Sequence, residues 1–346
     1  MRRVFLLGFL LLMLATPVHA QEYTAPEAPD SASDLIPIER TTFGQDLWTV
    51  IKGAIAKLQP EIASAAKICF ALIAITMAIS VVNSMPGRSS RVIELVGVVS
   101  AAGILLQRSG AMIHAGAETV TQLSEYGKLL LPVMTGALAA QGGITSSSAL
   151  YVCTTVFNTV LTSIISAVLI PLIYSYLALS IGSCGASQDI LIKLCDFVKW
   201  LCTWFLRTIL YIFTGFIGIT GVVSGTTDAA VLKTTRLTMS GMIPVVGGIL
   251  SDASEAVLVG AGVMKNAAGT YGLIAIIAIW ISPFIRIGIQ YLLLKLTAAV
   301  CDVFGVKQVS DLIGHFSNAM GILLAMTSAI CIIMLISITC FMKGVG

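Results

Sequence analysis

The chain has 346 residues, of which 57% are hydrophobic and only 11% are charged, and its formal net charge is +3. Soluble domains carry about 25% charged residues, so this composition excludes an ordinary soluble domain and indicates an integral membrane protein. The small net charge and the lack of a basic stripe with interleaved aromatic residues argue against a nucleic-acid partner.

Residues 1–20 have the layout of a signal peptide. Arg2 and Arg3 form a basic start, an apolar core follows, and Val18-His19-Ala20 resembles a cleavage site. An uncleaved anchor is the alternative, although the core is short for a membrane span. Either interpretation places the following segment, residues 21–60, outside the cytoplasm.

The segment 21–60 is expected to be an extracytoplasmic tether followed by an amphipathic helix. Residues 21–39 are rich in proline, serine and acids, which favours an unfolded tether. Thr42 and Gln45 have capping-box spacing, and Pro60 is expected to end the helix that they open. This helix is interpreted as resting on the membrane surface or as docking an extracytoplasmic partner. Its expected apolar face comprises Leu47, Trp48, Ile51, Ile55 and Leu58.

Residues 61–346 are predicted to form an all-α, polytopic membrane domain with about six transmembrane helices, together with amphipathic or re-entrant helices. Arg88 and Arg91 mark the first loop as cytoplasmic, which places both chain ends outside. The segments 107–148 and 224–270 are assigned to the outer side. The predicted spans are 62–82, 92–106, 149–182 with a bend at Pro171, a span that ends at Val223, 271–285 and 321–341.

The stretch Gly225–Gly272 lies between two long apolar runs and carries balanced charges. Pro244 and the pair Gly247-Gly248 are expected to break any helix there. Asp252 and Glu255 then have capping-box spacing and are expected to open a second helix. The pattern predicts helix, break, helix, with the break dipping toward the membrane, where broken backbone requires shelter.

An internal repeat is suggested by two short apolar pieces. Leu130–Leu138 matches Met242–Leu250 at an offset of 112 residues, and at the same offset Pro171 falls on Pro283. The copies would cover about 107–182 and 225–300. Paired segments interrupted by proline and glycine mark the central pathway of many transporters and channels.

Charged residues of the stretch Gly225–Gly272, called the central stretch below, are the candidate pathway or assembly residues. Lys233 and Arg236 precede the break, and Asp252 and Glu255 follow it at the same i,i+3 spacing. They form either a solvated hairpin or mutually neutralising pairs that line a pore or a subunit contact. The full candidate set is Lys233, Arg236, Pro244, Gly247, Gly248, Asp252, Glu255 and Lys265.

A small-residue face precedes this stretch and is expected to pack against another helix, within the chain or in another subunit. It consists of Gly215, Gly218, Gly221 and Gly225.

Catalytic and metal-binding signatures are lacking in the sequence. The eight cysteines include no C-x-x-C pair, and only three histidines occur, so neither a disulfide framework nor a zinc site is expected. No H-E-x-x-H, G-x-S-x-G or P-loop motif is present. We therefore expect a non-enzymatic protein without a cofactor.

The run K-x-x-R-x-x-x-S-G-x-I-P-V-V-G-G-x-L-S-D-A-x-E, from Lys233 to Glu255, and the later Lys265-Asn266-Ala267 resemble the stage III sporulation protein AE family. The resemblance implies a multi-pass membrane component of the sporulation channel complex that joins mother cell and forespore. It implies membrane partners that include an ATPase subunit, a place in the mother-cell membrane around the forespore, and no catalytic residue. The alternative from the residues alone is a self-contained permease with a broken-helix pathway.

Overall fold

The computed structural model describes residues 26–37, 42–85, 90–186, 189–242 and 247–343, with side chains throughout these ranges except at 59, 90, 189, 218–259 and 261. The regular elements in these ranges are helices, so the all-α prediction is confirmed. The predicted signal peptide and Pro244 lie outside the described residues.

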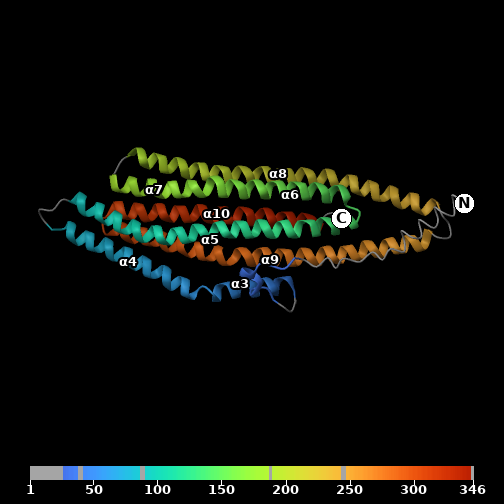
Figure 1. The fold of residues 1–346 in the computed structure, drawn as a ribbon, viewed down its shortest axis with the longest axis horizontal. Coiled ribbons are helices and arrows are strands. Elements are labelled where there is room, and N and C mark those ends of the chain that lie inside the picture. The colour runs from blue at the N-terminus through green and yellow to red at the C-terminus, as the bar shows by residue number, and fades with distance from the viewer. Residues whose placement is uncertain (1–25, 38–41, 86–89, 187–188, 243–246, 344–346) are drawn as a thin grey trace.

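Six helical crossings run side by side along the long axis of the molecule (Figure 1). Each crossing, over the residues that the structure describes, is long and apolar enough to cross a membrane, which confirms the predicted six spans. They are α4 (Gln59–Asn83), α5 (Ser90–Ala140), α6 (Ile144–Ile164) continuing through the π-helical turn η1 (Ile165–Leu169) into α7 (Ile170–Ala186), α8 (Asp189–Met242), α9 (Gly247–Val303) and α10 (Lys307–Lys343).

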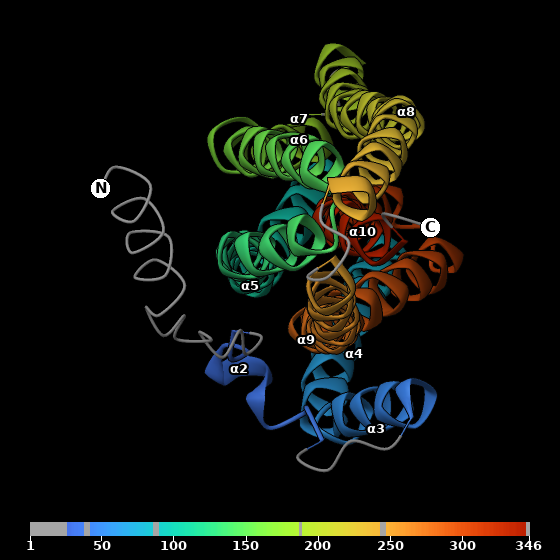
Figure 2. The same ribbon diagram turned by 90° about the vertical axis from the view of Figure 1, so that its right-hand side faces the viewer.

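Helix α10 occupies the centre of the bundle (Figure 2). It packs against α5, α6, α7, α8 and α9, and its Phe316, Met320, Met326 and Phe341 are completely buried. A helix that touches neighbours all round must be apolar all round. The uncharged run from residue 316 to residue 342 meets that requirement.

The helices are much longer than the predicted spans. Helices α5, α8 and α9 have 51, 54 and 57 residues, so each extends about 75 to 85 Å. A bilayer's hydrocarbon core is only about 30 Å thick. Segment 107–140, which the sequence assigned to an outer loop, is therefore a helical continuation of the second span and not a loop.

Pro132 does not break α5, contrary to the sequence interpretation. The helix ends eight residues later at Ala140, and Gly142 follows with a φ of +92°. The Gly142 and Gly143 amides donate to the carbonyls of Ala139 and Leu138. A left-handed glycine just after a helix satisfies the last carbonyls in this way, so glycine and not proline sets this helix end.

Pro171 marks an irregularity where the sequence predicted one. The five residues of η1 immediately precede α7, whose second residue is Pro171. Proline has no N–H and crowds the carbonyl four residues earlier, and a single π-helical turn relieves that crowding. The chain from residue 144 to residue 186 therefore remains one apolar crossing.

The first of the two proposed repeat pieces, Leu130–Leu138, lies wholly inside α5. Residues 243–246 of its counterpart, Met242–Leu250, lie outside the described residues. The two pieces are therefore not compared in full, and the internal repeat stays a prediction.

The N-terminal segment packs against the bundle and is not a loose tether over residues 26–37. Ala32, in the single turn α2 (Asp30–Ser33), and Leu35 are buried. Ser31 Oγ donates to Gln122 Oε1 at 2.9 Å, and the Tyr126 hydroxyl donates to the Pro26 carbonyl at 3.4 Å. This segment therefore lies along the middle of α5.

Helix α3 (Phe43–Ala56) begins after Thr42, as the capping pattern predicted, and packs against α9. Its buried face carries Asp46, Val50 and Ala54, while Trp48 and Ile55 of the predicted apolar face are exposed, so contact of that face with a membrane surface or a partner stays a prediction. Pro60 lies in the first turn of α4 and does not end α3. Proline fits a first turn because that position needs no N–H donor.

Two glycines of α5 provide a matched test of helix packing. A Cβ on Gly116 would lie 2.6 Å from Leu323 Cδ1 of α10, whereas a Cβ on Gly110 would meet nothing within 4 Å. We expect Gly116→Leu to cost about 1–3 kcal/mol through overpacking. Gly110→Leu, which shares the gain in helix propensity, should be neutral or stabilising. Thermal unfolding of both variants in detergent would measure this, and equal melting temperatures would contradict the close approach of α5 to α10.

Candidate functional site

The central stretch consists of two helical ends that project from the bundle. Gly262 of α9 lies against Gln141 at the end of α5, because a Cβ on Gly262 would be 2.6 Å from Gln141 Nε2. Residues 247–261 of α9 therefore run beyond the α5–α6 turn, and α8 also continues past it (Figure 1). The backbone is helical on both sides of residues 243–246, as predicted, and these helical ends project outward; the break itself lies outside the described residues, so its position relative to the membrane stays a prediction.

The predicted charge pairs lie on the two projecting helices. Lys233 and Arg236 belong to α8, nine and six residues before its last residue, Met242. Glu255 and Asp252 belong to α9, eight and five residues after its first residue, Gly247. Asp252 is thus inside a helix and is not its N-cap. The side chains of these four residues lie outside what the structure describes, so their pairing stays a prediction.

The remaining candidates fall in different surroundings. Lys265, on α9 just inside the bundle, has only 5% of its surface exposed. Gly247 and Gly248 begin α9. A Cβ on Gly215 would meet nothing within 4 Å, so close packing within the chain is not found at this position, and a subunit contact there stays a prediction. The side-chain surroundings of Gly218, Gly221 and Gly225 are not among those described.

A charge cluster that the sequence did not predict joins α4, α5 and α9. One oxygen of the Glu61 carboxylate accepts from Arg108 at 2.8 Å, and the other lies 3.1 Å from an Arg286 guanidinium nitrogen. The side chains are 29%, 17% and 35% exposed, respectively. Glu61 lies in the first turn of α4, where the helix dipole also favours an acid.

Arg286 lies well inside α9 and not at its end. It lies 17 residues before the end of α9 at Val303, or about 25 Å along the helix axis. Two guanidinium groups share one carboxylate, so the cluster has a formal charge of +1. Removing the carboxylate would leave two half-buried like charges facing each other, which is costly at low dielectric.

Buried polar contacts fix the register of the other helices. Thr154 Oγ1 of α6 donates to Ser337 Oγ of α10 at 2.9 Å, and Asn158 Nδ2 donates to Ser124 Oγ of α5 at 3.3 Å. Thr76 of α4 contacts Cys301 Sγ of α9 at 3.2 Å. Such contacts hold membrane helices together where burial of apolar surface gives little driving force.

One buried aromatic pair carries titratable groups. The Tyr176 hydroxyl of α7 lies 2.9 Å from His315 Nδ1 of α10, and the rings meet edge to face. All eight cysteines are free thiols. Over the part of the chain that the structure describes, no group of three histidine, cysteine, aspartate or glutamate side chains is arranged to hold a metal ion. The hydrogen bonds between helices therefore favour helix–helix attachment as the role of the buried polar residues.

Comparison with known proteins identifies a family. The family model described as stage III sporulation protein AE matches residues 34–344. A relative named stage III sporulation protein AE, from Bacillus subtilis (strain 168), is 24% identical over 227 residues. That alignment covers 66% of this chain and 57% of the relative, so it spans little more than half of the relative's length. No solved structure matches.

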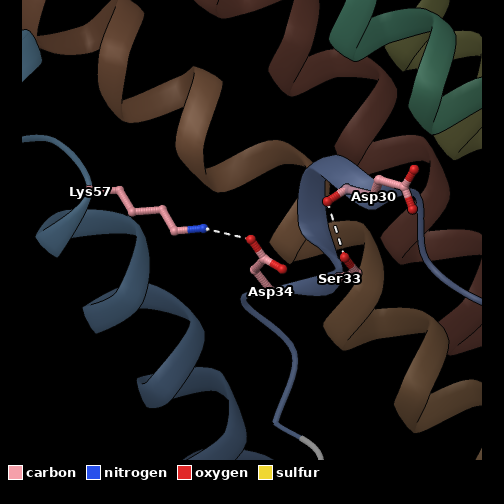
Figure 3. Close-up of polar contacts among 4 residues, drawn as sticks. All are labelled: Asp30, Ser33, Asp34 and Lys57. Atoms are coloured by element: carbon pink, nitrogen blue, oxygen red, sulfur yellow. Dashed lines mark hydrogen bonds and ion pairs between the residues drawn. The ribbon is translucent and has the colours of Figure 1, made fainter.

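The charge cluster has a matched control on the surface. Lys57 Nζ lies 3.4 Å from Asp34 Oδ2, and both side chains are more than half exposed (Figure 3). We expect Glu61→Gln to cost about 1–3 kcal/mol, because it leaves Arg108 and Arg286 without their shared carboxylate. Asp34→Asn should cost less than about 0.5 kcal/mol, since exposed pairs contribute little. Unfolding in detergent would compare the two variants, and an equal loss would refute a structural role for the cluster.

Proposed function

The chain belongs to the stage III sporulation protein AE family, and from this premise we propose that it is a non-enzymatic membrane subunit of the sporulation channel or secretion complex that links mother cell and forespore. The observation that carries the proposal is the family match over residues 34–344 on a protein with six candidate spans. Its place is the mother-cell membrane around the forespore, and its partners are other membrane subunits, including an ATPase subunit.

The charge distribution supports an orientation for this subunit. The chain segments 84–89, 187–188 and 304–306 connect helices at one end of the bundle. Arg88, Arg91, Lys193 and Lys307 lie in or next to these segments, and basic residues favour the cytoplasmic side. With this end in the cytoplasm, the N-terminal segment and the projecting ends of α8 and α9 lie on the opposite side, after cleavage of the signal peptide.

Projecting helical ends are suited to assembly with partners. Helices α8 and α9 reach beyond the α5–α6 turn, where this chain supplies few neighbours (Figure 1). The exposed Phe43 and Trp48 of α3 add an apolar surface on another side of the bundle. The self-contained permease draws less support, because α5 continues through Pro132 and the first of the paired segments is therefore not broken there.

The proposed neutralising pairs predict rescue in assembly. Glu255→Lys should reduce incorporation into the complex several-fold, because it replaces an attraction to the basic residues of α8 by a repulsion. Adding Lys233→Glu or Arg236→Glu should restore incorporation in part. Recovery of the tagged chain with its partners from sporulating cells measures this. If every chain with a single charge reversal is fully incorporated, the paired arrangement is contradicted.

Isolation of the complex tests the proposed function itself. Crosslinking a tagged chain in sporulating cells should recover other membrane proteins and an ATPase. The purified chain alone, reconstituted in liposomes, should give no solute flux. Flux without partners would favour the permease, and failure to recover any membrane partner would contradict the channel subunit.

A further inference from the structure

Helix α3 presents three different faces around its axis. The first is buried and packs on the bundle, chiefly on α9. At 3.6 residues per turn, the two sides that flank this buried face differ in chemistry. One side is apolar and consists of Leu47, Trp48, Ile51 and Ile55. The other side is polar and consists of Gln45, Thr49 and Lys52. The apolar side is open, since Trp48 and Ile55 are 66% and 55% exposed.

The chain itself covers the polar edge of α3 and not its apolar side. Leu35 of the N-terminal segment packs beside Gly53, because a Cβ on Gly53 would lie 3.1 Å from Leu35 Cδ2. By helical spacing, Gly53 lies where the buried face meets the polar side. The apolar side therefore has to find its cover outside this chain or remain in contact with water.

Helix α3 lies at one end of the candidate span α4. Only Lys57 and Leu58 separate α3 from α4. Helix α4 has 25 residues, so it is about 37 Å long. The hydrocarbon core of a bilayer takes up about 30 Å of that length. Unlike α5 and α9, α4 has little length to spare, so a crossing by α4 places its own start, and with it α3, close to a membrane surface.

The charges around the start of α4 mark the same level. Glu61, in the first turn of α4, holds Arg108 of α5 and Arg286 of α9, and the three side chains are between 17% and 35% exposed. Partly exposed charges are costly in hydrocarbon and are readily accommodated at a membrane surface. The charge cluster and the length of α4 therefore agree on where the membrane begins on this side of the bundle.

Two exposed lysines lie on the membrane side of that level. Lys67 of α4 and Lys295 of α9 follow Glu61 and Arg286 by six and nine residues. Helices α4 and α9 run in the same direction, because residue numbers rise together along their contacts. A helical side chain tilts toward the N-terminus of its own helix, which here is toward the charge cluster. Both lysines can therefore extend their ammonium groups back toward the surface while their apolar stems stay in lipid.

We propose that α3 is an interfacial helix, whose apolar side lies in the headgroup region of the lipid bilayer while its polar side faces water. Figure 2 shows α3 largely from its side, whereas α5 and α10 are seen nearly end on, so α3 is inclined to the bundle axis. Tryptophan suits the interface because its ring is apolar and its N–H is polar. The proposal assigns the apolar surface that α3 adds to the bundle to lipid, and it does not depend on the partners of the channel complex.

Quenching of Trp48 fluorescence by brominated lipids tests the proposal. The chain has four tryptophans, and Trp200→Phe, Trp204→Phe and Trp280→Phe leave Trp48 alone. The purified full chain is reconstituted in phosphatidylcholine vesicles whose acyl chains carry bromine either near the headgroup or near the chain end. We expect bromine near the headgroup to quench Trp48 about two-fold more strongly, because the apolar face of an interfacial helix enters the lipid by only about 5–10 Å.

A matched control moves the tryptophan to the polar side of the same helix. Trp48→Phe combined with Thr49→Trp, in the same background, should be quenched by aqueous acrylamide and several-fold less by brominated lipid. A second comparison keeps the other three tryptophans, in case their replacement prevents folding. The difference between the native chain and Trp48→Phe then gives the quenching of Trp48.

Each other outcome contradicts the interfacial helix. Quenching of Trp48 by acrylamide alone would leave its face to water or to a protein partner, and protection from both quenchers would place it inside the bundle. Stronger quenching by bromine near the chain end would place α3 in the hydrocarbon core. Equal lipid quenching of Trp48 and of the Thr49→Trp variant would show that α3 has no lipid-facing side. Because the purified chain carries no partner, failure of the channel assignment would leave these results unchanged.

Discussion

Satisfaction of backbone hydrogen bonds within each segment is the constraint on which this structure depends. Hydrocarbon offers no partner to an open N–H or carbonyl group, so a chain crossing it must bond within itself. The helix does this locally, which explains why α5 and α9 continue through Pro132 and Pro283. A proline removes one bond at its own position, whereas a broken segment would leave several groups unsatisfied. Left-handed glycines, Gly142 and Gly305, therefore follow the ends of α5 and α9.

The same constraint explains what the sequence predicted well. Apolar runs of sufficient length identify crossings by composition alone, and the six spans and the all-α class followed from them. Helix lengths did not follow, because charges such as Glu118 and Lys128 were interpreted as loop residues. In α5 these charges lie on one exposed face while Leu123, Tyr126 and Leu130 of the same helix are buried. A helix with one polar face has a mixed composition, and composition alone does not distinguish it from a loop.

The charge cluster could not be predicted from the sequence, for a different reason. Glu61, Arg108 and Arg286 are separated by 47 and 178 residues, and their meeting depends on how α4, α5 and α9 pack. The sequence did contain a signal, since each is an isolated charge beside an apolar run, where an unpaired charge is costly. Opposite signs in separate spans indicate that partners exist, but a single sequence does not say which charges meet. The prediction from the central stretch had the reverse weakness: it named the partners, but it left open whether they form a solvated hairpin or line a pore or a subunit contact.

Polar groups therefore do two different kinds of work in this bundle. Inside, Asn158, Ser124, Thr154 and Ser337 bond one another across helices, and they set register without facing the surroundings. Outside, on α5, the polar groups bond locally: Thr121 donates to the Ala117 carbonyl, Gln122 donates to Glu118, and Ser31 of the N-terminal segment donates to Gln122. The cross-helix bonds of the interior fix how the helices pack, because a buried polar group without a partner is costly. The exposed groups carry no such constraint, since water or another protein can satisfy them, so changes on the outer face of α5 should disturb the packing of the bundle less than changes inside it.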